Sequence, residues 1–133
     1  MDYVRSLSRQ NFADCRLPFR LAIRLRSEDV LIGFTGLKNG TLETNGSAEV
    51  FYSIYRDFWN NGYGTEALRA VINFGIKQIG LHRIFAGCDI DNLASKRTME
   101  KAGMHFESMW RQDRMRNGRW TDGLGYSIIS DDV

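Results

Sequence analysis

The chain is poor in the residues that build metal centres and disulfide frameworks. It has 133 residues, of which two are cysteine, two are histidine and one is proline. Cys15 and Cys88 are far apart with no CxxC pair, and His82 and His105 stand alone. We therefore expect no metal site and no disulfide framework. Cys88 lies among apolar residues and is expected to be a buried thiol, because unpaired cysteine is among the most buried residue types.

Charge of one sign and long hydrophobic runs are also lacking. The formal net charge is +2, which gives no reason to expect direct nucleic-acid binding or an acidic membrane as partner. No segment has the pattern of a signal peptide, and no apolar run is long enough to span a bilayer. With 43% hydrophobic residues, the length suits one domain with a sizeable core, so we expect a single cytoplasmic domain over residues 1–133.

Alternation of apolar and polar residues predicts strands in the first half of the chain. The pattern indicates three strands, over residues 19–26, 30–37 and 48–55. Asn39-Gly40 and Asn45-Gly46 mark the turn region between the last two, which favours an antiparallel meander. Residues 1–18 carry a looser helical pattern.

Helical periodicity follows the third strand. Spacings of three and four residues connect the apolar positions Leu68, Val71, Ile72, Gly75, Ile76 and Ile79, and Gly80 is a stop signal. A strand over residues 83–90 then implies a right-handed parallel crossover. Asn92 is the predicted N-cap of a second helix over residues 93–102, and Asn117-Gly118 joins strands 105–116 and 119–129 in a hairpin. This order predicts an α/β fold with a mixed, mostly antiparallel sheet.

The most informative stretch is the glycine-containing loop over residues 59–68, between a predicted strand and the long helix. Gly62 and Gly64 lie one residue apart at the start of that helix. Main-chain N–H groups at such a position can bind phosphate without a lysine, because the helix dipole is positive there. The loop therefore indicates a cofactor that carries a diphosphate.

Besides a diphosphate-binding loop of another class, two further readings of this loop are open. Gly62, Gly64 and Ala67 fit the dinucleotide fingerprint G-x-G-x-x-A, and Asp89 follows about 20 residues on at a strand end. Three features count against a dinucleotide-binding oxidoreductase. Residues 56–61 separate the glycines from the strand that they should follow directly, other strands precede that strand although it should open the domain, and the chain ends in a hairpin instead of further βα units. No P-loop motif occurs. A glycine turn that binds nothing is the third reading.

The loop resembles the acyl-CoA pyrophosphate loop of GNAT-type N-acetyltransferases, and the wider pattern is similar to their ribosomal-protein N-terminal acetyltransferase subgroup. The resemblance covers about residues 22–129. The motifs that carry it, weak singly and specific together, are Tyr55 and Trp59, residues 60–68, Gly80-Leu81-His82-Arg83-Ile84, Asn92-Leu93-Ala94-Ser95, Glu100-Lys101-Ala102-Gly103-Met104, Gly118, Asp122 and Tyr126.

The resemblance implies acetyl-CoA as co-substrate, with no metal. In such enzymes the strand before the loop separates from its neighbour and its main chain pairs with pantetheine. The cofactor-binding residues that this implies here are Ser53, Ile54, Tyr55, Trp59, Asn60, Asn61, Gly62, Tyr63, Gly64, Thr65 and Asn92. Family loops often carry a basic residue or Gln where this chain has Trp59, Asn60 and Asn61, and Arg56 or Arg69 could supply the missing charge.

The implied reaction is direct attack of a neutral amine on the thioester in a ternary complex, with Ser95 near the sulfur as proton donor. Asn92 and Ser95 are equally well an ordinary N-cap and first-turn residue. The general base has more than one candidate. Where close relatives have a glutamate, this chain has Arg114, and the neighbouring Asp113 replaces it only if a bulge turns its side chain to the other face. Glu49 and Glu107 are other candidates.

The acceptor is expected to be a primary amine, either a protein N-terminus or a small molecule. An α-amine has a pKa near 8 and a lysine near 10.4, so deprotonation at pH 7 costs about 1.4 against about 4.6 kcal/mol. A chain without an evident strong base therefore suits an α-amine better. Arginines gather on the final hairpin, where they either steer an acidic partner or form a solvated face: Arg111, Arg114, Arg116 and Arg119.

From the resemblance, we expect this sequence to start after the strand and helix that normally open the family fold and line the substrate side. We expect either an N-terminally shortened chain or a second subunit, such as a homodimer partner, that covers the exposed sheet. An acyl-CoA-binding domain with weak or no catalysis is therefore the alternative to an active enzyme.

Overall fold

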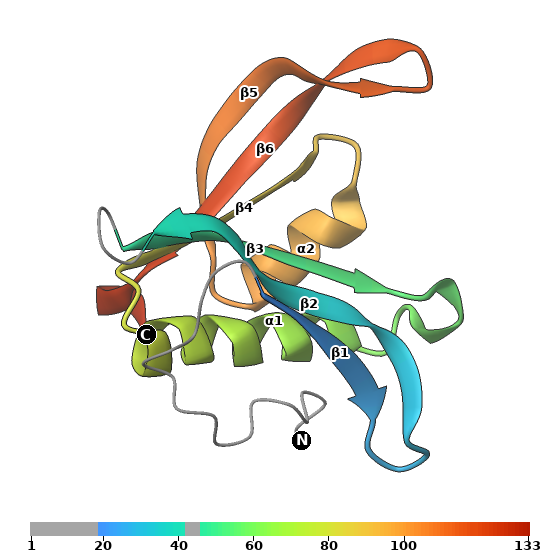
Figure 1. Cartoon of the computed structure of the whole chain (residues 1–133). Coiled ribbons are helices and arrows are strands. Elements are labelled where there is room, and N and C mark those ends of the chain that lie inside the picture. Colours follow the sequence, from blue (N-terminus) through green and yellow to red (C-terminus); the bar gives the residue numbers. More distant parts are fainter. Residues whose placement is uncertain (1–18, 42–45) are drawn as a thin grey trace.

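A six-stranded sheet with two α-helices on one face forms the body of the protein (Figure 1). The computed structural model describes residues 19–41 and 46–133. The strands are β1 (Phe19–Leu25), β2 (Val30–Thr41), β3 (Ser47–Ile54), β4 (Arg83–Asp89), β5 (His105–Arg116) and β6 (Arg119–Ile129). The helices are α1 (Tyr63–Asn73) and α2 (Leu93–Lys101), with short segments η2 (Arg56–Phe58), η3 (Phe74–Ile79) and η4 (Ser130–Asp132). The predicted α/β fold is confirmed.

The sheet order is β1-β2-β3-β4-β6-β5, and one pair, β3 with β4, is parallel. This confirms the predicted meander, the crossover through the first helix and the terminal hairpin. The hairpin turn has Asn117 at φ 51° and Gly118 at φ 76°, as a two-residue turn of this kind requires. The turn predicted at Asn39-Gly40 is wrong, because β2 continues to Thr41. Asn45, Cys15 and the helix predicted over residues 1–18 lie outside the described residues.

Helix α1 packs its apolar stripe against the sheet and continues into the π-helical segment η3. Its buried residues Ala67, Leu68, Val71 and Ile72 follow the predicted spacing. The predicted helix is therefore confirmed in extent, although its last turns widen to the π form. Gly80 ends the segment at φ 89°.

Helix α2 begins at the predicted N-cap and is tied to the sheet. The Asn92 side chain accepts a hydrogen bond from the Ser95 amide (3.1 Å), and Met99 is fully buried. From β6, the Tyr126 hydroxyl donates to the Glu100 carboxylate at 3.0 Å. Burial, reinforced by that bond to Glu100, raises the Tyr126 pKa to about 12, so the hydroxyl keeps its proton at physiological pH.

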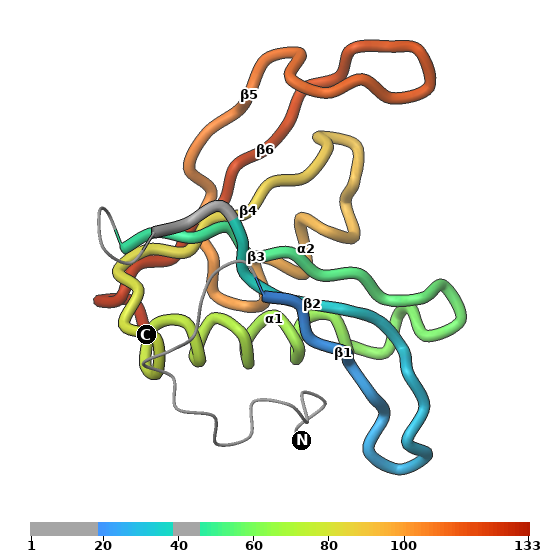
Figure 2. The backbone as a smooth tube through the Cα atoms, viewed as in Figure 1, coloured from blue at the N-terminus to red at the C-terminus, as the bar shows by residue number. Residues whose placement is uncertain are grey.

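The sheet opens between its two parallel strands. Over their full described lengths, β3 and β4 pair at three positions, from Ser47 with Arg83 to Glu49 with Phe85. Beyond that point the strands diverge, and the β5–β6 hairpin extends away from the rest of the body (Figures 1 and 2). The gap between β3 and β4 lies beside the start of α1, so the fold brings the glycine loop to its mouth. No helix in the described part of the chain is long and apolar enough to cross a membrane.

Candidate functional site

The loop before α1 presents main-chain amides at the helix start. Gly62 is the N-cap and has φ 80°, in the left-handed region that suits glycine. The first hydrogen bond of the helix runs from the Glu66 amide to the Gly62 carbonyl at 3.1 Å. The amides of Gly64 and Thr65 therefore have no carbonyl acceptor within the helix, which is the arrangement that binds anions.

Side chains of the loop hold its own backbone in shape. The Trp59 indole N–H donates to the Ile54 carbonyl (2.7 Å), and the Asn61 side-chain Nδ2 donates to the carbonyls of Phe58 (3.1 Å) and Trp59 (2.9 Å). Asn60 takes a left-handed conformation with φ 65°. Trp59 and Asn61 are therefore positioned to organise the loop, which leaves anion binding to the backbone.

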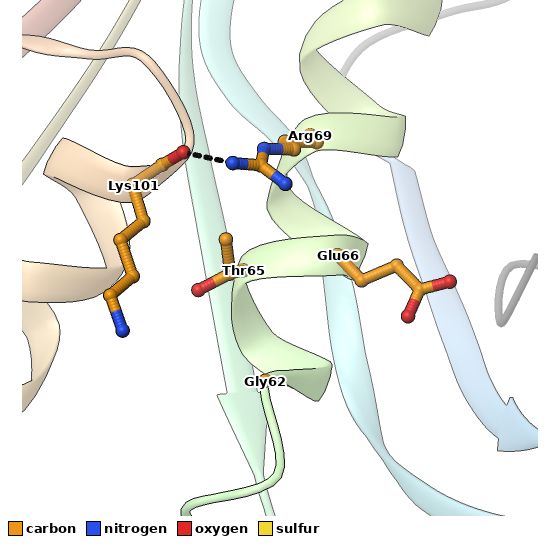
Figure 3. Close-up of a pocket in the computed structure, with 5 residues that line it drawn as sticks. All are labelled: Gly62, Thr65, Glu66, Arg69 and Lys101. Carbon is orange, nitrogen blue, oxygen red and sulfur yellow. Dashed lines mark hydrogen bonds between the residues drawn. The ribbon is translucent and has the colours of Figure 1, made fainter. Parts of the chain in front are cut away.

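A pocket of about 510 Å³ lies beside the helix start, lined by Gly62, Thr65, Glu66, Arg69 and Lys101. The Arg69 guanidinium donates to the Lys101 carbonyl at 2.5 Å, which ties α1 to the end of α2. Figure 3 shows Thr65, Arg69 and Lys101 on one side of α1, whereas Glu66 extends away on the other side. Two cationic residues thus line the pocket beside the helix start. Sequence reasoning named Arg69 and missed Lys101, which is distant along the chain.

The main chain of β3 alternates between facing β2 and facing the gap. The Tyr55 amide donates to the Ile32 carbonyl (2.8 Å), so alternate residues along β3 point the same way. Ser53 therefore faces β2 as well, and its carbonyl lies against Gly33. Of the predicted trio Ser53, Ile54 and Tyr55, the main chain of Ile54 faces the gap, together with that of Tyr52. The Ile54 carbonyl already accepts the Trp59 indole N–H, which leaves its amide to face the gap.

Ser95 and Tyr52 meet on the helix side of the gap. The Ser95 hydroxyl oxygen lies 2.7 Å from the Tyr52 hydroxyl oxygen, and the Ser95 amide is bound by the Asn92 cap. Burial raises the pKa of Tyr52, so its hydroxyl is protonated at neutral pH and can act as a donor. The sequence analysis named Ser95 and Asn92 but missed Tyr52, because alternation on a strand makes it look like an ordinary core position.

Cys88 lies on β4 on the same face of the sheet. It is buried, as predicted, with 3% of its surface exposed. Burial raises the pKa of its thiol, which therefore carries its proton at neutral pH. Such a thiol is a poor nucleophile.

A bulge in β5 changes the direction of the base candidate Asp113. The register with β6 shifts between Trp110 and Arg114, and Gln112 has φ 48°. Asp113 then lies with its carboxylate against the backbone of Gly123, 3.7 Å from the Arg114 Nε. The bulge required for Asp113 to serve as base is present.

The two alternative base candidates have different surroundings. The Glu107 carboxylate accepts two hydrogen bonds from Arg83, at 2.6 and 2.8 Å, and these lower its pKa. It is therefore a weaker base than an ordinary glutamate. Glu49 lies at the last paired position of β3, opposite Phe85.

Asp89, the acid of the dinucleotide reading, is engaged within the protein. Its carboxylate accepts hydrogen bonds from the Thr121 hydroxyl (2.5 Å) and the Asp91 amide (2.9 Å), and Arg116 lies 3.9 Å away. The Thr121 bond is the main reason that its pKa is lowered. The Thr121 bond thus ties one carboxylate oxygen to the hairpin, and the Asp91 amide occupies the other, so neither oxygen is set up to bind a ribose hydroxyl.

A model of the acetyltransferase (GNAT) domain matches residues 2–105. The chain belongs to the GNAT acetyltransferase family. Among curated relatives, the uncharacterized N-acetyltransferase YnaD of Bacillus subtilis is 31% identical over 113 residues, which are 85% of this chain and 65% of YnaD. The uncharacterized N-acetyltransferase YoaA of the same organism is 34% identical over 110 residues, or 83% of this chain and 62% of YoaA.

Solved GNAT structures share the fold. An acetyltransferase of the GNAT family from Bacillus anthracis is 28% identical with a TM-score of 0.77, over 84% of this chain and 66% of that one. A ribosomal-protein alanine acetyltransferase from Vibrio fischeri is 26% identical with a TM-score of 0.79, over 86% of this chain and 62% of that one. The chain thus spans slightly less than two thirds of the length of these relatives.

Proposed function

We propose that this GNAT domain transfers an acetyl group from acetyl-CoA to a primary amine. The observation that carries the proposal is the gap between β3 and β4, which opens beside unpaired amides at the start of α1. A helix start binds the diphosphate, and the gap accepts the extended pantetheine arm between two strands. Family membership supports the same assignment.

The residues around the gap fit the proposed co-substrate. The amides of Gly64 and Thr65 would bind the diphosphate, with Arg69 and Lys101 beside them for charge. A Cβ added at Gly64 would lie 3.7 Å from Ile54 and Thr98 side-chain carbons, in ordinary van der Waals contact, so the helix start at Gly64 lies close to both β3 and α2. The side-chain nitrogen of Asn92, which the cap does not use, is the group we assign to the pantetheine arm.

Acetyl-CoA supplies the acetyl group as a thioester. The Ile54 amide, which faces the gap, would donate to the carbonyl oxygen as negative charge develops there. We assign Asp113 to accept the proton of the attacking amine. The Ser95 hydroxyl would give its proton to the departing sulfur, with the hydroxyl of Tyr52, 2.7 Å away, as the source that restores it.

The proposed acceptor is an α-amine, at a protein N-terminus or on a small molecule. The lower cost of deprotonating an α-amine favours it over a lysine or polyamine. The likeness to a ribosomal-protein alanine acetyltransferase supports a protein N-terminus. A spermidine N-acetyltransferase from Vibrio cholerae is 20% identical with a TM-score of 0.79, a likeness that concerns the fold alone.

The test is a titration followed by a turnover assay. Isothermal titration should give saturable binding of acetyl-CoA and none of a nicotinamide dinucleotide. Mixed α-amines with acetyl-CoA should then release free CoA, detected by a thiol reagent, faster than acetyl-CoA with enzyme alone.

Each outcome separates one alternative. Saturable binding of the dinucleotide alone would overturn the proposal in favour of an oxidoreductase domain. Binding of acetyl-CoA with no CoA release would leave an acyl-CoA-binding domain without catalysis. An Asp113→Asn variant, with the acid's shape but no basic carboxylate, should bind acetyl-CoA normally and lose turnover.

A further inference from the structure

Two side chains of the edge strand β5 lie across the sheet on the face opposite the helices. The indole of Trp110 covers Gly87 and Gly125, since a Cβ added at those glycines would lie 2.5 and 2.8 Å from its ring carbons. The guanidinium of Arg114 covers Gly87 and Gly123, with Nη2 and Nε at 2.8 and 3.0 Å from the corresponding positions. Any larger residue at these glycines would displace the two side chains.

This arrangement lies beside the gap. Gly87 follows Phe85, the last β4 residue that pairs with β3, so its backbone borders the open part of the sheet. Ser95 and Tyr52 lie on the helix side of the same gap. Trp110 and Arg114 therefore flank the opposite side, from which an acceptor can approach without crossing the helices.

The Arg114 side chain has hydrogen-bonding capacity to spare. Its Nε is shielded from solvent and has no hydrogen-bond partner among the described residues. The nearby Asp113 carboxylate is 3.7 Å from that nitrogen, an ionic contact longer than a hydrogen bond. The side chain is 36% exposed, so a ligand can reach it. A planar guanidinium presents several donors and matches a carboxylate in a two-point contact.

We infer that Arg114 selects the acceptor by binding a carboxylate carried a few atoms from the reacting amine. The inference rests on the proposed acetyl transfer and names its substrate class. Amino acids and peptides with a nearby acidic residue fit this class, whereas a polyamine would bring like charge to the guanidinium. Trp110 supplies a flat apolar wall beside it, over which the acceptor's carbon chain can lie.

The test compares acceptors that differ in one carboxylate. Rates of CoA release are measured for alanine against alaninamide, and for the capped dipeptide Ala-Asp-amide against Ala-Asn-amide, with spermidine as the cationic acceptor. We expect at least one pair to favour its carboxylate member by about 10- to 100-fold in kcat/KM, the range of one charge-assisted contact. The pair that responds distinguishes a free amino acid from an acidic peptide.

Variants connect that preference to Arg114. Arg114→Gln should remove the preference mainly by raising KM, Arg114→Lys should keep part of it, and the exposed hairpin control Arg119→Gln should keep all of it. Thermal denaturation establishes that each variant is folded. The inference is overturned if the unaltered protein gives equal rates within both pairs or prefers spermidine. It is also overturned if Arg114→Gln keeps the preference unchanged.

A failure of the proposed function is distinguishable. If no acceptor releases CoA, titration of N-acetylalanine and of N-acetyl-Ala-Asp-amide into the CoA-loaded protein still measures carboxylate binding. If the unaltered protein binds these carboxylates saturably and Arg114→Gln abolishes the binding, the inference is supported even though no catalysis occurs. If the unaltered protein does not bind them, or if Arg114→Gln binds them equally well, the inference is contradicted.

Discussion

Replacing Gly64 by alanine should weaken cofactor binding while leaving the fold as stable as before, or more so. The added Cβ would meet Ile54 and Thr98 carbons at 3.7 Å and a Tyr52 carbon at 3.9 Å, which are ordinary van der Waals contacts. Gly64 is the second residue of α1, where alanine is favoured over glycine by up to about 1 kcal/mol. The melting temperature should therefore stay level or rise by a few degrees.

Binding should change in the opposite direction. The methyl group would occupy the mouth of the gap, where the diphosphate must approach the amides of Gly64 and Thr65. Loss of one hydrogen bond to a charged group costs about 1.5–3 kcal/mol, or about 10- to 100-fold in Kd. Isothermal titration with acetyl-CoA measures this loss, and a thermal scan without ligand measures stability.

Gly80 provides the matched control. Its φ is 89°, so Gly80→Ala strains the backbone and should lower the melting temperature, but it lies at the far end of η3 and should leave Kd unchanged. The two alanine variants should thus show opposite patterns. A Gly64→Ala protein that binds acetyl-CoA as tightly as the unaltered chain would refute the placement of the diphosphate.

Three further predictions concern single side chains. Tyr52→Phe should lower kcat by about 10-fold or more with little change in the Kd of acetyl-CoA. Because the two hydroxyls act together, this loss of kcat should be smaller in a Ser95→Ala background. Equal losses in both backgrounds would contradict a shared proton path. Asn92→Asp keeps the cap oxygen but removes the side-chain N–H donors, so turnover should fall at unchanged melting temperature, whereas Asn92→Ala should also cost about 1 kcal/mol of stability. The pKa of Asp89 is lowered on folding, so its stabilising contribution is complete above about pH 4 and is lost as pH falls further. In thermal scans between pH 2 and 5, the melting temperature of Asp89→Asn should therefore fall less with acid than that of the unaltered protein.

Local signals predicted most of the fold. The alternation in β1, the spacing of Leu68, Val71 and Ile72, and the Asn117-Gly118 turn each depend on neighbours in sequence, and the structure contains the element each one predicts. The failure at Asn39-Gly40 has a cause of the same kind. A turn-forming dipeptide is only a propensity, and pairing of β2 with β3 extends past it to Thr41.

The site was less accessible from sequence, because its contacts join distant segments. Tyr52 and Ser95 are 43 residues apart, and Arg69 and Lys101 are 32 apart. Whether the main-chain groups of Ser53 and Tyr55 face β2 or the gap depends on which residues of β3 form hydrogen-bonded pairs with β2. The alternation of apolar and polar residues in the sequence does not determine this. The bulge that places Asp113 and Arg114 likewise appears only in the register of β5 with β6.

Binding of the CoA diphosphate by the amides at the start of α1 is tested most directly by following the backbone amide resonances of the protein during titration with CoA. We expect the largest shifts on Gly64 and Thr65 at the start of α1 and on Ile54 at the gap, and we expect Gly64→Ala to remove them at the same ligand concentration. Largest shifts on amides remote from α1 and β3, with Gly64 and Thr65 unmoved at saturation, would contradict it.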